Sequence, residues 1–164
     1  MGLAWTVRHD ADTMRVALEG ELDEDSRLST FAREVSATAV VFDLAGVKRI
    51  NSVGVRDWLT AMAELDGRGV ALTLERCAPA IVAQLNMIRN FASSARVLSV
   101  LAPYVCDSCE REHTTLLDLA DGRATPEPVV ACPSCGASAS FDDIPTEFLR
   151  FTERARPSRR APDQ

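Results

Sequence analysis

Residues 41–59 read VFDLAGVKRINSVGVRDWL, and this stretch decides how the first part of the chain is expected to fold. The short apolar run from Ala39 to Leu44 is typical of a buried strand. A loop through Gly46 then leads to Asn51 and Ser52, whose side chains can accept hydrogen bonds from the first N–H groups of a helix. Apolar residues recur at helical spacing beyond this point. The stretch therefore predicts a strand, a loop and a helix in that order.

Hydrophobic periodicity on both sides extends this unit into a larger α/β domain. The expected elements are, in order, a β-hairpin that turns at 10–12, a helix with Leu28, Phe31 and Val35 on one face, the strand at 39–44, a helix with Val55, Leu59 and Met62 on one face, a strand at 70–74, a helix that begins at Pro79, and a last strand at 97–101. A hairpin is antiparallel, whereas strands joined through helices are parallel. The order ββαβαβαβ therefore predicts an α/β fold with a mixed β-sheet and three helices.

Four of the five cysteines lie in the last third of the chain as two pairs, Cys106-x2-Cys109 and Cys132-x2-Cys135. Each two-residue gap lets one tight turn present both sulfurs to a metal ion. Four thiolates suit tetrahedral Zn²⁺ in a closed, structural site. Gly136 permits the positive φ that such a turn often needs. The spacing therefore predicts one structural Zn²⁺ per chain, bound by these four cysteines.

The segment around the cysteines resembles a zinc ribbon. Residues 105–141 contain too few apolar side chains to form a core of their own, so a metal is expected to hold them together. The expected elements are a strand at 112–119, a turn at Asp121-Gly122, a return strand at 129–131, and a short helix near Pro145 with Ile144, Phe148 and Phe151 on one face. The sequence thus predicts a small zinc-ribbon module after the α/β domain.

Other uses of the cysteines remain open from the sequence alone. Iron could occupy the same four ligands, the two pairs could form disulfides or a thiol oxidoreductase, and His113 could replace one cysteine as a ligand. Cys77 stands alone at the end of a strand, where we expect a small buried hydrophobic residue rather than a nucleophile.

The change from hydrophobic periodicity to cysteine spacing at Ala102-Pro103-Tyr104 marks an expected boundary. We expect four segments: an α/β domain at 1–102, a zinc ribbon at 103–143, a short helix at 144–153 and a disordered, Arg-rich tail at 154–164.

The charge of the chain favours a protein partner over nucleic acid. The formal net charge is −6 and the isoelectric point is about 4.9, although residues 150–164 alone carry +3. A protein that binds phosphate backbones needs the opposite sign over most of its surface. Neither a signal peptide nor an apolar run of membrane-spanning length is present, so we expect a cytoplasmic protein that does not insert into membranes. The oligomeric state is left open.

Residues 41–59 resemble the signature of STAS domains, the anti-sigma-factor-antagonist family, and Gly20-Glu21-Leu22-Asp23 resembles the other landmark of that family. The resemblance implies a STAS-like sheet domain that docks protein partners, often ATP-binding kinases of the anti-sigma type or large sensory complexes. In phosphorylated members the loop reads Asp-Ser-Ser-Gly, and the second serine accepts the phosphate. Here the loop is Asn51-Ser52-Val53-Gly54, so the phospho-acceptor position falls on Val53, which has no hydroxyl. The usual phosphate-driven switch is therefore not expected.

We therefore expect a non-catalytic regulatory or scaffold protein. The expected partner-binding residues surround the start of the second helix: Asn51, Ser52, Val53, Gly54, Arg56 and Asp57. We expect Ser52 to act through its hydroxyl as a helix cap rather than as a modified residue. Enzyme chemistry is disfavoured because only His9 and His113 offer an imidazole base, and no nucleophile elbow or phosphate-binding glycine loop is present. The alternatives are a thiol redox sensor that acts through the zinc–cysteine site, and a nucleic-acid adaptor that uses the ribbon and the Arg-rich tail.

Overall fold

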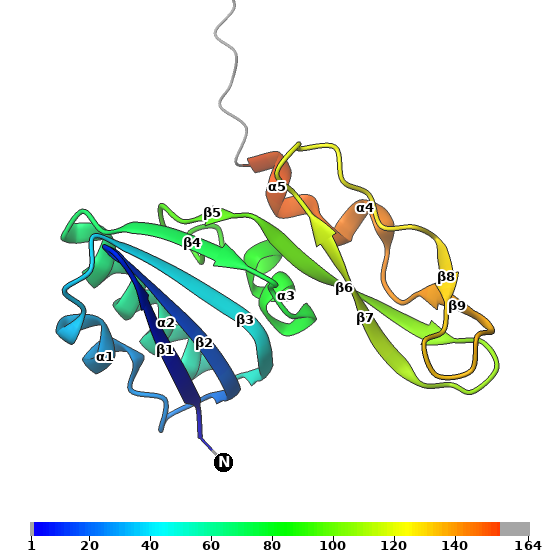
Figure 1. Cartoon of the computed structure of the whole chain (residues 1–164), viewed down its shortest axis with the longest axis horizontal. Helices are drawn as coiled ribbons and strands as arrows, with labels where there is room; N and C mark the ends of the chain where they lie inside the picture. The colour runs from blue at the N-terminus through cyan, green and yellow to red at the C-terminus, as the bar shows by residue number, and fades with distance from the viewer. Residues whose placement is uncertain (1, 155–164) are drawn as a thin grey trace, which may run out of the picture.

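The computed structural model describes residues 2–154, which form two β-sheets and five helices (Figure 1). Residues 155–164, nearly all of the expected tail, lie outside the described residues. The first sheet belongs to the N-terminal part of the chain and the second sheet to the C-terminal part (Figure 1). Within residues 2–154, no helix has both the length and the apolar character needed to cross a membrane.

The first sheet has five strands in the order β1-β2-β3-β4-β5. These are β1 (Ala4–Asp10), β2 (Thr13–Leu22), β3 (Ala39–Ile50), β4 (Ala71–Glu75) and β5 (Arg96–Val97). β1 and β2 form an antiparallel hairpin, and the remaining neighbours pair in parallel. The prediction of a mixed α/β sheet that opens with a hairpin is therefore confirmed.

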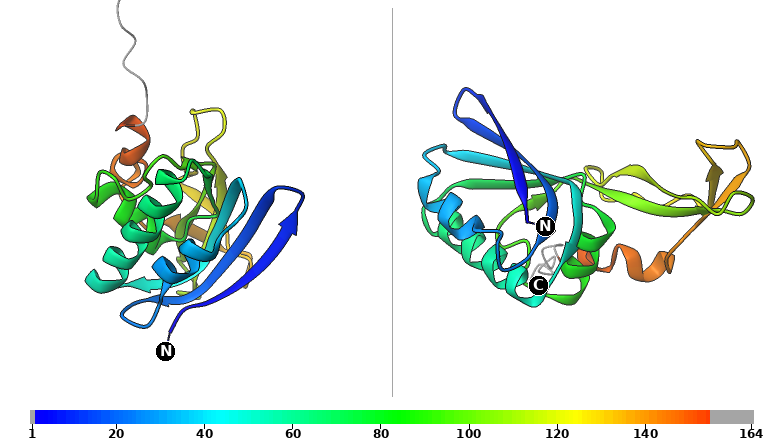
Figure 2. Two further views of the ribbon diagram at one scale, coloured as in Figure 1. Left: turned by 90° about the vertical axis from the view of Figure 1, so that its left-hand side faces the viewer. Right: turned by 90° about the horizontal axis from the view of Figure 1, so that it is seen from below.

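Three helices cover one face of this sheet (Figure 2). They are α1 (Leu28–Glu34), α2 (Ser52–Gly67) and α3 (Pro79–Met87), as expected from the periodicity. On the covered face of β2, Met14, Val16 and Leu18 are buried. On the opposite face Arg15 forms an ion pair with Glu75, with 3.0 Å between Nη1 and Oε1. The alternation of apolar and charged residues along the strand thus decides which face the helices cover.

The buried face of α2 centres on Trp58, which is fully buried. The Trp58 ring stacks on Phe91 at a centroid distance of 5.3 Å and meets the edge of Phe42 at 5.4 Å. Its Nε1–H donates to the carbonyl oxygen of Phe91 at 2.8 Å, so the polar atom of this large side chain is satisfied. Val55 and Leu59, which were expected on the inner face, are only half-buried at its margin.

The expected loop through Gly46 is wrong, because β3 continues through this glycine to Ile50. Gly46 pairs with Glu19 of β2, next to a register shift between Ala17 and Glu19. A Cβ atom on Gly46 would lie 2.6 Å from the carbonyl oxygen of Leu18. The glycine therefore marks a close approach of two strands at an irregular register, which a sequence pattern does not distinguish from a loop.

The expected last strand at 97–101 is two strands, β5 and the longer β6 (Ser99–Cys106). Backbone hydrogen bonds of 3.1 Å and 2.9 Å tie Cys77 to Ser99 and Leu101 at the start of β6. β6 then runs without interruption through Pro103 into the second sheet, with every second residue buried. The change in sequence character at 102–104 therefore falls inside one continuous strand.

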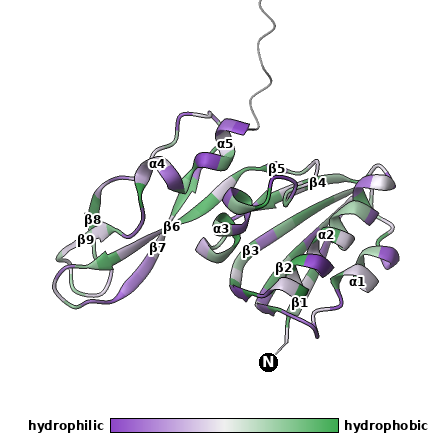
Figure 3. Ribbon diagram, turned by 180° about the vertical axis from the view of Figure 1, so that it is seen from behind, coloured by the Kyte–Doolittle hydropathy of each residue, from purple (hydrophilic) through white to green (hydrophobic). Residues whose placement is uncertain are grey.

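Figure 3 shows hydrophobic residues along β3 and along β6.

The second sheet is antiparallel, with the order β7-β6-β9-β8. It contains β7 (Glu112–Asp118), β8 (Val129–Ala131) and β9 (Ser138–Phe141) together with β6. The expected return strand at 129–131 exists, but it pairs with β9 and not with β7. β6 lies between β7 and β9, so the chain after the 121–122 turn crosses to the far side of the sheet, where β8 pairs with β9.

The expected C-terminal helix is split into α4 (Pro145–Phe148) and α5 (Arg150–Arg154). Phe148 and Phe151 are buried as expected, but Ile144 is 61% exposed. Ile144 has extended backbone angles just before Pro145, so it precedes the helix and does not share its inner face. Phe148 packs edge-on against Phe141 of β9 at 5.3 Å, which joins these helices to the second sheet.

Candidate metal centre and docking surface

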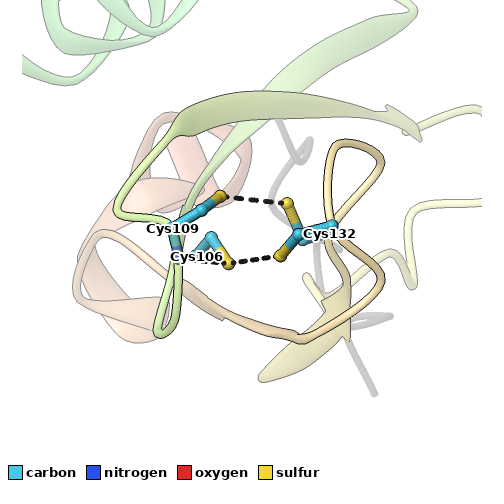
Figure 4. Close-up of side chains that lie close together, drawn as sticks. Cys106, Cys109 and Cys132 are labelled. Carbon is cyan, nitrogen blue, oxygen red and sulfur yellow. Dashed lines mark hydrogen bonds between the residues drawn. The ribbon is translucent and has the colours of Figure 1, made fainter.

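The two turns after β6 and β8 bring the four predicted cysteines into one cluster (Figure 4). The sulfurs of Cys106 and Cys135 lie 3.5 Å apart, and those of Cys109 and Cys132 lie 3.8 Å apart. All four sulfurs lie within 4.8 Å of one another. A tetrahedron with metal–sulfur bonds of about 2.3 Å has edges of about 3.8 Å, so the donor set fits a tetrahedral metal ion such as Zn²⁺. The four cysteines could hold a metal ion.

The two cysteine turns have the same backbone geometry. The N–H of Glu110 donates to the carbonyl of Cys106 at 3.1 Å, and the N–H of Gly136 donates to the carbonyl of Cys132 at 2.9 Å. Glu110 and Gly136 both have positive φ, 59° and 77°. The positive φ predicted for Gly136 is thus confirmed, whereas Glu110 adopts the same conformation without the freedom of a glycine. Both turns therefore share one hydrogen bond and one positive φ, and each turn directs its two sulfurs toward the same point.

Backbone N–H groups stabilise the thiolate form at the first cysteine of each turn. The N–H of Cys109, at 3.3 Å, and that of Ser108, at 3.4 Å, donate to the sulfur of Cys106 and lower its pKa to about 6. The pKa of Cys132 is also lowered, chiefly by the N–H of Cys135. A lowered pKa makes the thiolate, which is the metal-binding form, available near neutral pH.

Two other thiols, those of Cys135 and Cys77, resist ionisation. The pKa of Cys135 is raised to about 11; the N–H of Ala137 opposes this rise, but the adjacent Cys106 sulfur and desolvation outweigh it. Four sulfurs this close together therefore cannot all carry charge unless a cation lies between them. Burial raises the pKa of Cys77 to about 12, with the charge of Asp43 as a smaller cause. Cys77 is fully buried and free, as expected of a small hydrophobic core residue.

His113 is not part of the metal-ligand cluster found in residues 2–154. It lies on β7 opposite Tyr104, and the two rings stack with centroids 5.6 Å apart. Neither ring nitrogen has a hydrogen-bond partner among the described residues. The alternative in which His113 replaces a cysteine is therefore disfavoured by its position.

The helix cap at the start of α2 is Asn51 and not the expected Ser52. The Asn51 side-chain oxygen accepts the N–H of Gly54 at 2.8 Å, and its amide nitrogen donates to Glu24 at 3.0 Å. Asn51 has the extended backbone of a cap residue, whereas Ser52 is already the first helical residue. The pKa of Glu24 is lowered by its own backbone N–H and by Asn51. Asn51 therefore contacts both the start of α2 and the turn between β2 and α1 that contains Glu24.

The two landmark segments of the sequence, 20–23 and 51–54, meet in space. The N–H of Asn51 donates to the carbonyl of Leu22 at 3.0 Å. Gly54 is buried, and a Cβ atom there would overlap the Leu22 carbonyl and lie 2.8 Å from the nitrogen of Asp23. A glycine is thus required for the first turn of α2 to pack on the end of β2.

The predicted partner-binding residues divide into two groups. Asn51, Ser52, Val53 and Arg56 are exposed, and the Val53 side chain is 45% exposed although it is apolar. Gly54 is buried in the contact just described, and Asp57 is partly buried. The exposed group forms a surface at the first turn of α2, which we call the docking surface.

Asp57 has a structural role that the sequence pattern did not indicate. Its carboxylate accepts the N–H of Leu28 at 2.6 Å and the N–H of Ser29 at 3.1 Å, so it caps the start of α1 from a different helix. Arg68, just beyond α2, donates to the carbonyls of Ala32 and Val35 at the other end of α1. These partners are about thirty residues apart in sequence, and no local motif connects them.

No protein-family model and no curated protein matches this chain. Several solved structures are similar to it, among them two anti-sigma factor antagonists. The anti-sigma factor antagonist SpoIIAA in its unphosphorylated form has 19% sequence identity and a TM-score of 0.44, over 57% of this chain and 87% of that chain. An anti-sigma factor antagonist from Mycobacterium paratuberculosis has 18% identity and a TM-score of 0.47, over 58% of this chain and 84% of that chain.

Proposed function

We propose that this chain is a non-catalytic regulatory or scaffold protein that docks a signalling protein through the docking surface at the start of α2. The observation that carries the proposal is the exposed Val53 on a helix start that is held rigidly in place. Gly54 packs on Leu22, and Asn51 caps the helix, so the surface is ordered without a partner. Little conformational entropy is then lost when a partner binds.

The chemistry of the docking surface favours a partner that offers an apolar side chain next to a carboxylate. Val53 supplies the apolar contact, and Arg56 is an exposed cation one turn further along α2. The first N–H groups of a sixteen-residue helix add partial positive charge at the same place. The resemblance to anti-sigma-factor antagonists makes an anti-sigma-like kinase or a sensory complex the proposed partner. With valine at the usual phospho-acceptor position, docking would be constitutive rather than switched by phosphate there.

We assign a structural role to the metal centre, with one Zn²⁺ per chain bound by Cys106, Cys109, Cys132 and Cys135. The fit of four sulfurs to a tetrahedron and the exposure of most residues of β7 and β8 support this role. Five free cysteines also suit a reducing compartment, so we propose a cytoplasmic location.

The docking proposal is tested by substituting Val53. Wild type, Val53→Asp and Leu116→Asp would each be immobilised and exposed to lysate of the native organism, and retained proteins identified by mass spectrometry. Leu116 is the matched control, because it is an exposed apolar residue on β7 in the other sheet. We expect an ATP-binding kinase or a sensory protein that Val53→Asp loses and Leu116→Asp retains. Equal retention by all three proteins would exclude Val53 from the interface.

A thiol redox sensor is the second candidate, and the exposure of Cys135 favours it. Its sulfur lies 3.5 Å from that of Cys106, whose pKa is lowered, so the pair is accessible to an oxidant. Zinc release measured under mild peroxide distinguishes the two roles. A structural site keeps its zinc for as long as the protein stays folded, whereas a sensor releases zinc within minutes and regains it after reduction.

A further inference from the structure

A cleft of about 590 Å³ lies where α3, β5, the turn at 119–124 and α5 meet. Its walls come from both halves of the chain, and its apolar lining includes Leu85, Ile88, Val97 and Phe151. This volume lies within the range of small-molecule sites, which often form where two modules meet. The cleft shares no residue with the docking surface or with the metal centre.

Three arginines line the cleft, and no acidic residue does so among the described residues. They are Arg89 after α3, Arg96 on β5 and Arg154 at the end of α5. None of the three forms an ion pair within residues 2–154. The chain as a whole carries −6, so three unpaired cations around one apolar cleft form a local reversal of charge. Such an arrangement attracts an anion whose remaining surface is apolar.

Hydrogen bonds to a single residue, Asn86, hold the wall of the cleft in place. The Asn86 amide nitrogen donates to the carbonyl of Phe148 at 3.0 Å, and its side-chain oxygen accepts the N–H of Phe151 at 2.8 Å. The Asn86 carbonyl accepts a hydrogen bond from the Arg154 guanidinium at 2.8 Å. α5 is therefore fixed against α3, and the cleft is formed before any ligand arrives.

We propose that this cleft binds one small amphipathic anion, with its apolar body against Leu85, Val97 and Phe151 and its anionic head between Arg89 and Arg96. The segment 155–164 is a poor occupant by charge, because it adds Arg156, Arg159 and Arg160 to an already cationic rim. A small molecule with an apolar body and a carboxylate or phosphate head matches both the apolar lining and the arginines of the cleft.

Calorimetric titration of the full chain with decanoate and with decyl phosphate tests this proposal. We expect saturable binding of one molecule per chain for at least one of the two probes. Decanol, which lacks the charge, should bind about tenfold more weakly or not at all, since one charged hydrogen bond is worth about that factor. Acetate keeps the charge but lacks the apolar body, so it loses the burial of apolar surface and should also bind at least about tenfold more weakly. Equal binding of decanol and decanoate, or no binding of either anionic probe, would overturn the proposal.

The double substitution Arg89→Gln with Arg96→Gln should weaken binding of the anionic probe by about tenfold or more and leave decanol unaffected. Arg154 is left unchanged because it also holds α5. The matched control is Arg8→Gln with Arg33→Gln, two exposed arginines outside the cleft. If both double variants lose affinity equally, the effect is one of net charge and the cleft is not the site. Binding that appears only after residues 155–164 are removed would assign the cleft to that segment and also overturn the proposal.

Discussion

The two sheets of this molecule are stabilised by different means, and the cysteines show the difference most directly. In the first sheet, Cys77 is one of many buried side chains around Trp58, and its thiol stays protonated. In the second sheet, β7 and β8 expose most of their residues, and the four clustered sulfurs lie beside a small aromatic contact of Tyr104, Phe141 and Phe148. The same residue type is thus a packing element in one half and a proposed metal ligand in the other. What separates the two uses is the local density of apolar side chains.

β6 connects the two modes of stabilisation. Its first half is hydrogen-bonded to Cys77 and carries the buried Val100 and Ala102, while its second half ends in Cys106, one of the four clustered cysteines. Both tryptophans of the chain lie in the first sheet domain, and its single tyrosine, Tyr104, lies in the second half of β6. Tryptophan and tyrosine signals therefore report on the two regions separately.

Removal of the metal is expected to have the largest effect. Chelation should unfold residues 105–141 and leave the first sheet folded, because structural zinc supplies about 10 kcal/mol or more of folding free energy. Hydrogen exchange should show protection lost beyond residue 104 and retained at Leu101, whose N–H bonds to Cys77 at 2.9 Å. Chelation should also change the near-UV signal of Tyr104 and leave tryptophan fluorescence unchanged.

Alkylation provides the control for this experiment. The zinc-loaded protein should contain one zinc and resist alkylation at all five cysteines, whereas the chelated protein should react at four and spare Cys77. Cys77→Ala should keep its zinc. Metal-free protein with a fully protected second sheet would show that the two regions are not stabilised differently after all.

Within the first sheet domain, Gly54→Ala is expected to be the most disruptive single change. The added Cβ overlaps the Leu22 carbonyl, and a backbone shift at that contact should cost about 3 kcal/mol. Gly67→Ala, in the last turn of the same helix, meets no atom within 4 Å and should stabilise the protein by about 0.5 to 1 kcal/mol. Urea unfolding followed by tryptophan fluorescence measures both. Similar values for the two variants would refute the close contact.

The degree to which the sequence predicts each region follows from how local its signals are. The hairpin, the three helices and the cysteine ligands depend on spacings within a few residues, and these predictions are confirmed or fit the geometry. Two features were mispredicted: the course of β3 through Gly46, and the pairing of β8 with β9. Both depend on contacts with a neighbouring strand, β2 for Gly46 and β9 for β8, and not on local spacing. The cap that Asp57 provides to α1 was not predicted, because this contact spans 29 residues.

Asp57→Asn tests that long-range cap and should have an intermediate effect. Loss of the carboxylate charge weakens two hydrogen bonds to the start of α1, with an expected cost of about 1 to 2 kcal/mol. Glu64→Gln on the same helix removes only an exposed pair with Arg68 at 3.9 Å, and should change stability by less than about 0.5 kcal/mol. If Asp57→Asn instead left stability unchanged but abolished partner capture, Asp57 would belong to the docking surface as the sequence predicted.

The smallest expected effect concerns Glu24, beside the docking surface. Its pKa is lowered from 4.5 in the folded state, first by its own backbone N–H and then by Asn51. A group whose folded pKa is lowered contributes stability above its unfolded pKa, and this contribution disappears as pH falls through the folded value. Wild type should therefore be slightly more stable than Glu24→Gln at pH 6, and the gap should narrow as the pH falls below 4.5 and close once Glu24 is protonated in the folded state. The matched control is Glu34→Gln, since Glu34 is exposed and its carboxylate receives no hydrogen bond within residues 2–154. Tryptophan fluorescence confines the comparison to the first sheet domain even if acid releases the metal. A gap that stayed the same size throughout the acid range would mean that Glu24 acts through packing and not through its charge.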